Sequence, residues 1–368
     1  MFNSRLNKLS GLLRSSNLEA LALNPSPSLV YLTGLHFHLM ERPTVVFFTA
    51  DAAPVIILPE LEMLKVRDLP FEIKAFPYGE NPAEWDKVFH EASHSLGLAG
   101  KRIGVEPLHM RVLEFCKVIA IAGETECSDA TQVVGSLRVC KDADEISAMR
   151  KAVKVAQVAL EATLSSIKVG ATEKEIASEL VASLLRHGSQ PEMPFAPIVS
   201  SGPNSANPHA SPSDRKLRPG DLLVVDWGAA VDGYISDLTR TFAVGEVDEE
   251  YCKIHQVVQE ANAAGRAAAQ PGVPCANVDI AARKVIEKSG YVKLFTHRTG
   301  HGIGMEPHED PYIRGDNLQL LEPGMTFTVE PGIYLPERNG VRIEDNIVIT
   351  EDGAECLSDM KRGLRRVG

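Results

Sequence analysis

The sequence predicts an α+β protein of two domains: a smaller α/β domain over residues 1–135 and a larger α+β domain over residues 136–368. Helical and strand patterns alternate through the first part of the chain. Long helical periodicities and apolar strand-like segments fill the rest, as is typical of helices that cover an antiparallel sheet. A chain of 368 residues is long enough for two domains that each bury a core.

Composition narrows the classes of protein to which the chain can belong. A hydrophobic content of 44% and a charged content of 24% are ordinary for a soluble globular protein. No apolar run is long enough for a membrane-spanning helix, and the N-terminus lacks the pattern of a secretory signal. The six cysteines form no CxxC pair, so we expect a reduced protein in the cytoplasm. A net charge of -11 argues against nucleic acid as the main partner.

In the first domain, the N-terminal residues predict an amphipathic helix. The apolar segments TVVFFTA (44–50) and VIILPEL (55–61) flank a turn at Asp51–Pro54, which predicts a β-hairpin. Further on, KRIGVE (101–106) predicts a strand, and HMRVLEFCKVIA (109–120) predicts the helix that follows it.

We expect a domain boundary near Cys140–Asp144, before the most regular helical pattern of the chain. Asp142 and Glu145 are typical of a capping pair at the start of a helix, and Gly170 is typical of its end. The apolar positions of this pattern are spaced three or four residues apart, or at a multiple: Ile146, Met149, Val153, Leu160, Leu164 and Ile167.

Further helices follow in the second domain. Thr172 with Glu175 predicts a capping box that opens a helix to about Leu185. Helices are also expected at about 250–269 and about 278–289. The last of these has Asn277 as its N-cap and Gly290 as its stop.

Four acidic residues fall within four strand patterns that otherwise look core-forming. The patterns are DLLVVDWG (221–228), YISDLTRTFAV (234–244), MTFTVEPGIYL (325–335) and VRIEDNIVIT (341–350). A hairpin across the 231–233 turn would bring Asp226 beside Asp237. A strand pair across the 337–340 turn would do the same for Glu330 and Glu344.

Such acids need an explanation, because burying an unpaired carboxylate is costly and several in one pocket repel one another. A divalent cation removes both costs, and His301 in TGHGIG (299–304) offers a nitrogen ligand where glycines let the backbone approach closely. The alternative is an ordinary ion pair, of Asp237 with Arg240 or of Glu344 with Arg342. Spacing alone leaves both interpretations open.

Five short motifs occur in a fixed order within about 120 residues. They are DWG (226–228), SDLTRT (236–241), TGHGIG (299–304), EPGIY (330–334) and RIEDN (342–346). In this order they resemble the pita-bread metallopeptidases, which include prolidase (Xaa-Pro dipeptidase), aminopeptidase P and methionine aminopeptidase. The resemblance implies a C-terminal pita-bread catalytic domain preceded by a smaller creatinase-like α/β domain.

The resemblance also implies two divalent metal ions for each subunit. The ligands carried over are Asp226, Asp237, His301, Glu330 and Glu344. Four carboxylates and one imidazole form a hard site that suits Mn²⁺, and Co²⁺ and Zn²⁺ are the alternatives.

Other residues receive roles from the same resemblance. Glu330 is the expected proton shuttle, and three histidines at family spacing, His209, His297 and His308, are expected to position the substrate and stabilise the oxyanion. Any one of these histidines alone is more often an ordinary surface or core residue. Arg342 is expected to fix Glu344 or Asp226 from behind.

Among the family's activities, we rank Xaa-Pro dipeptidase first and aminopeptidase P on longer peptides second. Methionine aminopeptidases lack the N-terminal domain and the extra histidines. A creatinase-like hydrolase or a binding scaffold would typically have lost metal ligands, and nothing in the sequence indicates a role on DNA or at a membrane. The expected partners are short proline-containing peptides.

Relatives with this layout are commonly homodimers in which one subunit's N-terminal domain borders the other subunit's active site. We therefore expect the segment Tyr31–Pro43, which contains His36, Phe37 and His38, to make that contact. The alternative is a strand end whose histidines are incidental.

A dipeptidase must recognise the free carboxylate of its substrate, for which an arginine is well suited. Some prolidases carry an arginine directly after a His-Glu-Xaa-Pro motif. This chain has Tyr312 there and Arg314 two residues later, and both would point the same way in a regular strand. We expect Arg314 to reach the site. Further candidate substrate contacts are Tyr312, Phe195, Tyr234 and His38.

Overall fold

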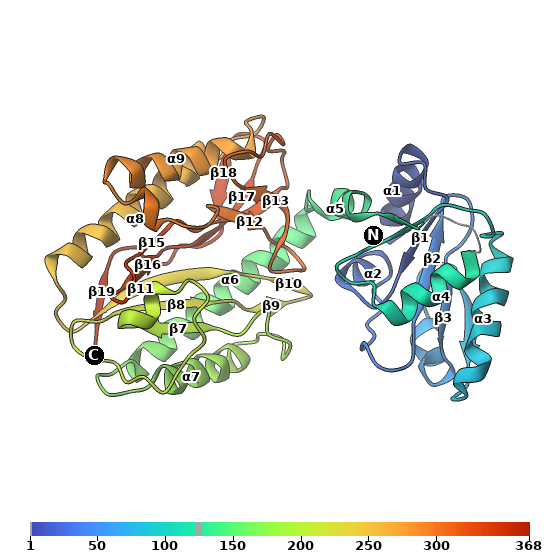
Figure 1. Ribbon diagram of the computed structural model, residues 1–368, viewed down its shortest axis with the longest axis horizontal. Coiled ribbons are helices and arrows are strands. Elements are labelled where there is room, and N and C mark those ends of the chain that lie inside the picture. The colour runs from blue at the N-terminus through green and yellow to red at the C-terminus, as the bar shows by residue number, and fades with distance from the viewer. Residues whose placement is uncertain (1, 123–126) are drawn as a thin grey trace. The chain divides into compact units, whose positions relative to one another are not determined.

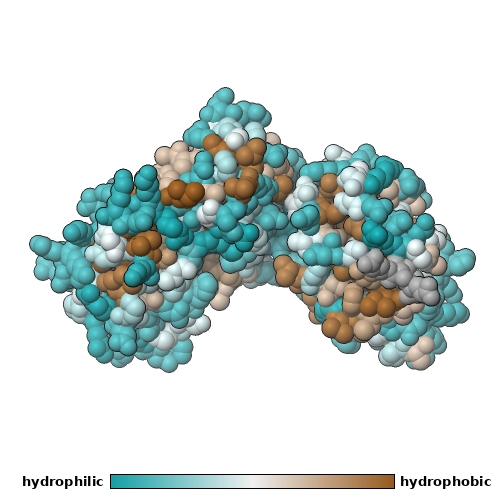
Figure 2. All heavy atoms as spheres, turned by 45° about the horizontal axis from the view of Figure 1, so that its top comes forward, coloured by the Kyte–Doolittle hydropathy of each residue, from teal (hydrophilic) through white to brown (hydrophobic). Residues whose placement is uncertain are grey.

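The computed structural model describes residues 2–122 and 127–368, which divide into two compact units, Met1–Arg138 and Val139–Gly368. We call them the N-terminal unit and the C-terminal unit (Figure 1). Among the described residues, no helix is long and apolar enough to cross a membrane. The face shown in Figure 2 is mostly hydrophilic and is interrupted by scattered hydrophobic patches.

The N-terminal unit contains a six-stranded mixed sheet in the order β4-β3-β2-β1-β5-β6. Its strands are β1 (Ala20–Leu23), β2 (Val45–Thr49), β3 (Val55–Pro59), β4 (Lys74–Tyr78), β5 (Ile103–Val105) and β6 (Cys127–Asp129). Its helices are α1 (Phe2–Ser15), α2 (Pro27–Thr33), α3 (Pro82–Ser95), α4 (Val112–Ala122) and α5 (Thr131–Arg138), with a 3₁₀ turn at Glu60–Val66.

Residues of both faces of β1, β2 and β3 are buried, so this sheet is covered on each side. Strands β2 and β3 form the predicted antiparallel hairpin, and β5 is followed by α4 as the sequence indicated. The predicted N-terminal helix is α1, which buries Leu9 and Leu13.

In the C-terminal unit, helices cover two main sheets from outside (Figure 1). The first sheet, in the order β19-β11-β8-β7, packs against α6 (Ala143–Thr163) and α7 (Glu173–Arg186). Its strands are β7 (Ile198–Ser201), β8 (Leu222–Trp227), β11 (Leu238–Val244) and β19 (Arg365–Val367). All its strand pairs are antiparallel except β11 with β19.

The second sheet, in the order β13-β12-β14-β17-β18, packs against α9 (Cys275–Lys288). Its strands are β12 (Gly300–Gly302), β13 (Glu309–Ile313), β14 (Thr326–Val329), β17 (Asp345–Ile349) and β18 (Ala354–Cys356). Two short hairpins complete the unit: β9 (Ala230–Val231) with β10 (Tyr234–Ile235), and β15 (Gly332–Tyr334) with β16 (Gly340–Arg342). Helix α8 (Glu249–Ala268) packs with α9 over β15 and β16.

The predicted α6 and α7 begin where their capping residues indicated. Asp142 with Glu145 and Thr172 with Glu175 both form complete capping boxes, in which each side chain bonds to the other residue's backbone N–H. Helix α6 ends at Thr163, earlier than its apolar pattern suggested, and a short 3₁₀ turn carries Leu164–Ser166.

The start of α9 differs from the prediction. The helix begins at Cys275 after Pro274, three residues before the position that an Asn277 cap implies. The reason is tertiary: the N–H groups of Cys275 and Ala276 donate to the carbonyls of Gln319 and Asn317. A neighbouring backbone segment therefore satisfies the first helical donors, and no side-chain cap is needed.

The two predicted acid-bearing pairs form, but three of the four acids lie at strand ends. Asp226 is within β8, whereas Asp237 precedes β11, Glu330 follows β14 and Glu344 precedes β17. At Asp237 the ladder is interrupted because its N–H and carbonyl bond to the side-chain amide of Asn346. The backbone therefore leaves regular strand geometry near the place where the two sheets meet. Glu344 and Thr239 form an isolated β-bridge between the two sheets there.

Candidate metal centre

A cleft of about 830 Å³ opens between the two sheets of the C-terminal unit. All five predicted ligands line it, together with the three predicted histidines, Arg342 and Phe195. The complete lining is Phe195, Ala196, Ile198, Pro208, His209, Asp226, Asp237, His297, Arg298, His301, Glu306, Pro307, His308, Glu330, Arg342 and Glu344.

The ligand atoms converge on a small volume. Asp237, His301 and Glu344 each offer one atom, and these three atoms lie within 4.8 Å of one another. The Nε2 atom of His301 is 3.3 Å from Oε1 of Glu330 and 3.7 Å from Oδ2 of Asp237. This spacing leaves room for an ion between ligand atoms that do not bond directly to each other.

Three carboxylate oxygens in this cleft have no hydrogen-bond partner among the described residues although they are fully buried. They are Oδ1 of Asp226, Oδ1 of Asp237 and Oε1 of Glu344. The other oxygen of Asp226 accepts from Nη2 of Arg342 at 2.5 Å, and the other oxygen of Glu344 accepts from the Thr239 hydroxyl at 2.7 Å. The carboxylates of Asp226 and Glu344 are therefore held on one side by the protein and open on the other.

Burial, followed by repulsion from the neighbouring acids, raises the pKa of Asp237 and Glu344 well above the ordinary carboxyl range. Burial likewise raises the pKa of Glu330 to about 8, with Arg342 opposing the shift. A divalent cation would offset this cost by placing positive charge between the acids. Open oxygens, one imidazole and mutual repulsion together fit a site for hard divalent cations.

The hydrogen bonds of the histidines assign their tautomers. Nδ1 of His301 faces the Gly302 carbonyl at 3.1 Å, and because a carbonyl only accepts, the proton is on Nδ1 and the Nε2 lone pair faces the acids. Nδ1 of His308 accepts from Arg298 at 3.3 Å, which places the proton of neutral His308 on Nε2. The rings of His301 and His308 lie 4.0 Å apart between centroids.

His297 belongs to a hydrogen-bonded chain behind the ligands. Its Nδ1 donates to the Arg298 carbonyl, and its Nε2 is 2.9 Å from the Tyr334 hydroxyl. That hydroxyl also accepts from Nη1 of Arg342 at 3.0 Å. Burial lowers the pKa of His297 to about 4, so the ring stays neutral and accepts from Tyr334.

The glycines beside His301 allow the backbone contacts that the sequence suggested. A Cβ atom at Gly300 would lie 1.9 Å from the Thr328 carbonyl oxygen, and one at Gly302 would lie 2.2 Å from that of Asp310. Larger residues would push β12 away from β13 and β14, and with it the His301 ligand.

The predicted ion pairs of the alternative interpretation do not form. Arg240 bonds to Asp345 and not to Asp237, and Arg342 bonds to Asp226 and not to the Glu344 carboxylate.

Three predicted substrate contacts are not where the sequence placed them. Strand β13 ends at Ile313, so Arg314 is exposed and its guanidinium pairs with Asp316 at 3.0 Å outside the cleft. Tyr312 is not a lining residue, but its ring lies under the Arg298 guanidinium at 4.5 Å. Tyr234 is buried and donates to Glu145 instead of lining the cleft. The remaining contact, His38, is an exposed residue of the N-terminal unit.

Sequence reasoning missed Arg298, Thr239 and Tyr334, which contact the predicted residues directly. Thr239 and Tyr334 are members of the quoted motifs, and Arg298 lies between His297 and Thr299. Membership in a motif was therefore the available signal for Thr239 and Tyr334, and adjacency to His297 was the signal for Arg298.

Two family models match the chain and together cover most of it. The model of metallopeptidase family M24 matches residues 147–351, and that of the creatinase/prolidase N-terminal domain matches residues 5–140. The chain is 35% identical over 370 residues to a probable dipeptidase PepE from Mycobacterium tuberculosis, covering 99% of this chain and 96% of that protein.

Two solved structures extend the comparison. A prolidase from Thermococcus sibiricus is 33% identical with a TM-score of 0.94, covering 100% of this chain and 99% of that one. An X-Pro aminopeptidase from Thermotoga maritima is 29% identical with a TM-score of 0.85, covering 98% and 99%. The chain belongs to metallopeptidase family M24, with a creatinase/prolidase-type N-terminal domain and a pita-bread catalytic domain.

Proposed function

We propose that this metallopeptidase is an Xaa-Pro dipeptidase that uses two divalent cations, Mn²⁺ in the first place and Co²⁺ or Zn²⁺ as alternatives. The observation that carries the proposal is the set of buried, unpartnered oxygens of Asp226, Asp237 and Glu344, arranged with Glu330 around Nε2 of His301. Bound in this set, the cations would lower the pKa of a water molecule so that hydroxide is available near neutral pH.

The protein's own groups would then handle the proton and the substrate carbonyl. Glu330, which lines the cleft with its Oε1 3.3 Å from Nε2 of His301, would take a proton from the nucleophilic water and deliver it to the leaving nitrogen. The Nε2–H of His308 would donate to the developing oxyanion, and His209 would orient the peptide. His297 accepts from Tyr334 and would act by keeping Tyr334 and Arg342 in place.

Arg298 supports a preference for dipeptides. Two cationic side chains line the described cleft, and Arg342 is paired with Asp226. No described carboxylate lies within ion-pair distance of Arg298. Its guanidinium is held by the Tyr312 ring and by His308, beside the group assigned to the oxyanion. A planar donor fork without an acidic partner suits the free carboxylate of a C-terminal proline.

The alternative is an Xaa-Pro aminopeptidase that acts on longer peptides. The position after the His-Glu-Asp-Pro segment holds Tyr312 in place of an arginine, which favours this alternative, as does the likeness to the Thermotoga enzyme.

We further propose a homodimer in which the Tyr31–Pro43 segment borders the partner's site. The six free cysteines support a reducing, cytoplasmic setting.

The test compares kcat/KM for an Ala-Pro dipeptide with that for an Ala-Pro-Ala tripeptide in the Mn²⁺-loaded protein. A dipeptidase prefers the dipeptide by at least about tenfold, equal to about 1.4 kcal/mol. Arg298→Gln removes that preference, whereas Arg314→Ala, the matched arginine outside the cleft, keeps it. Equal or faster cleavage of the tripeptide by the wild type establishes the aminopeptidase, and no cleavage of either after metal loading rejects both.

A further inference from the structure

The ligand Glu344 is restrained at every polar atom except the oxygen that faces the cleft. Its backbone N–H donates to the Thr239 carbonyl at 3.1 Å, and its Oε2 accepts from the Thr239 hydroxyl at 2.7 Å. Its backbone carbonyl accepts from Nη1 of Arg240 at 2.7 Å. Only Oε1 is left without a described partner, so the direction in which this ligand points is set by Thr239 and Arg240.

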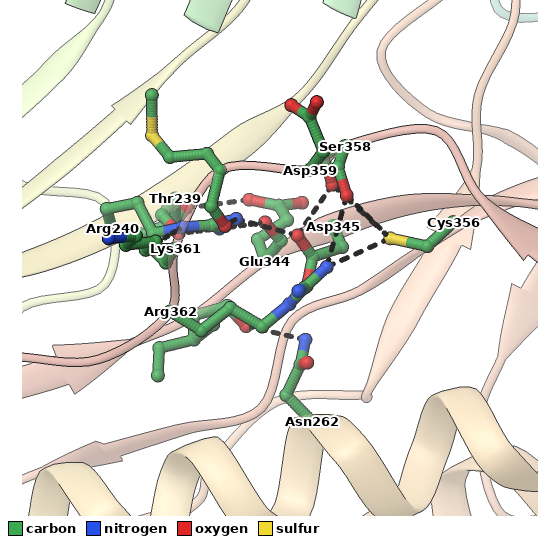
Figure 3. A network of polar contacts seen from close by, with 12 residues as sticks. Thr239, Arg240, Asn262, Glu344, Asp345, Cys356, Ser358, Asp359, Lys361 and Arg362 are labelled. Carbon is green, nitrogen blue, oxygen red and sulfur yellow. Dashed lines mark hydrogen bonds and ion pairs between the residues drawn. The ribbon is translucent and has the colours of Figure 1, made fainter. Parts of the chain in front are cut away.

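Arg240 uses all five of its N–H donors on three chain segments (Figure 3). Nη1 donates to the carbonyls of Thr239 and Glu344, at 2.8 and 2.7 Å. Nη2 donates to Oδ1 of Asp345 at 2.8 Å and to the Met360 carbonyl at 2.9 Å, and Nε donates to the Lys361 carbonyl at 3.1 Å. The side chain is 4% exposed, so each of these bonds is shielded from water.

Asp345 anchors this arginine from the opposite side. It is fully buried and also accepts from the Ser358 hydroxyl and from Nε of Arg362, each at 2.6 Å. Burial alone would raise the pKa of Asp345, but Arg240 and Arg362 outweigh burial and lower it to about 2. The hydrogen bonds of Asp345 with Arg240, Ser358 and Arg362 tie the C-terminal segment Cys356–Arg362 to the strands that carry the predicted ligands.

We propose that Arg240, held by Asp345, is a positioning residue for the metal centre: it fixes the backbone of Thr239 and Glu344 so that Oε1 of Glu344 points at the bound cation. The proposal rests on the metal site of the proposed function. A metal site binds tightly only when its ligands are held closely in place. Groups that orient metal ligands typically raise metal affinity by roughly tenfold to a hundredfold.

Arg362 offers the matched control. It shares the Asp345 carboxylate with Arg240, and its other described contacts are Sγ of Cys356 and the Ser358 carbonyl. None of its described hydrogen bonds reaches Thr239 or Glu344. A change at Arg362 therefore disturbs the same buried charge without touching the ligand.

The experiment titrates the metal-stripped full-length protein with Mn²⁺ by calorimetry and records its thermal unfolding. Arg240→Lys keeps a positive charge for Asp345 but cannot reach five acceptors. We expect its Mn²⁺ affinity to fall by about tenfold to a hundredfold. Arg362→Lys should change that affinity by less than about twofold, because the contact lies outside the ligand's own hydrogen bonds.

A folded Arg240→Lys protein that binds Mn²⁺ as tightly as the wild type overturns the proposal, and so does an Arg362→Lys protein that loses as much affinity. If Arg240→Lys does not fold, the double variant Arg240→Gln/Asp345→Asn removes both charges together and should show the same loss of affinity. Because the titration uses no peptide, a wild type that binds Mn²⁺ but leaves Ala-Pro intact rejects the proposed substrate and still decides the role of Arg240.

Discussion

Glu344 and Asp345 are adjacent in sequence and equally buried, yet their carboxylates have opposite surroundings. Glu344 faces other acids and keeps one oxygen without a described partner, and burial raises its pKa well above the ordinary range. Asp345 faces three arginines, Arg240, Arg266 and Arg362, and a serine, and its pKa is lowered to about 2. Burial is common to both, so burial alone does not distinguish a ligand site from an internal ion pair.

The distinguishing feature is whether the protein itself satisfies the carboxylate. Asp345 receives positive charge and hydrogen bonds from within the chain, which makes it part of the scaffold. Glu344 and Asp237 have no ion pair with a described arginine or lysine, and a bound cation would supply the missing positive charge. Glu344 directly precedes β17 and Asp345 is its first residue, so one step along the chain separates the two surroundings.

Exchanging each acid for its amide tests this difference most directly. Asp345→Asn leaves Arg240 and Arg362 without their buried counter-charge and should destabilise the protein by about 3–5 kcal/mol. Glu344→Gln removes one of several mutually repelling carboxylates, so the metal-stripped protein should be as stable as the wild type or more stable. Urea unfolding of metal-stripped samples measures both effects.

The same two variants should also differ in how well they bind Mn²⁺. Glu344→Gln should lose Mn²⁺ occupancy and peptidase activity together, because a ligand charge is gone. Should Glu344→Gln instead destabilise the stripped protein as much as Asp345→Asn does, the Glu344 carboxylate would belong to the scaffold and the distinction drawn between the two acids would be wrong.

A third buried acid, Glu173 at the start of α7, sharpens the comparison because neutral donors alone satisfy it. Its carboxylate accepts from the backbone and hydroxyl of Ser201, from the Asn204 amide, and from the backbone and hydroxyl of Ser213. These bonds tie down both ends of the loop that carries His209.

Glu173→Gln should destabilise the protein by about 1–3 kcal/mol, because an amide nitrogen would face N–H donors. It should also lower kcat, since His209 is less well positioned, while Mn²⁺ affinity stays unchanged. Glu179→Gln, on the same helix in a partly exposed pair with Arg186, should cost at most about 1 kcal/mol. Loss of Mn²⁺ affinity in Glu173→Gln would show that the loop acts through the metal centre.

The parts of the fold that the sequence predicted depend on local signals. The capping boxes at Asp142 and Thr172 lie within four residues, and the hairpin of β2 and β3 follows from its turn. The start of α9 was wrong because distant carbonyls of residues 317 and 319 satisfy its first donors. A local pattern carries no information about such partners.

The candidate site shows the same division. The resemblance selected the four histidines and four of the five acids that line the described cleft, all but Glu306, but it did not indicate which acid pairs with which arginine. The bond from Arg240 to Asp345 joins residues 105 positions apart, whereas the alternative interpretation of the sequence had paired Arg240 with Asp237. The expectation that Arg314 reaches the cleft was wrong for a related reason. Strand β13 ends at Ile313, one residue before Arg314, so the direction of the Arg314 side chain could not be inferred from strand alternation.

The last prediction concerns His255, whose Nε2 is buried without a described partner but lies outside the group formed by Asp237, His301 and Glu344. Burial, and then the charge of Arg240, lowers its pKa from 6.5 to about 4. The unfolded chain therefore binds a proton between these pH values that the folded chain does not. The contribution of His255 to the free energy of unfolding is fully present above about pH 6.5. It falls as the pH drops towards 4, by up to about 1.4 kcal/mol per pH unit. His255→Leu should flatten this decline in urea unfolding of the metal-stripped protein, whereas Leu at the exposed His187 of the same unit should not. An unchanged slope in His255→Leu would mean that water or a shift of α8 already accommodates the charged ring, and that an unpartnered buried atom is informative only where other ligand atoms surround it.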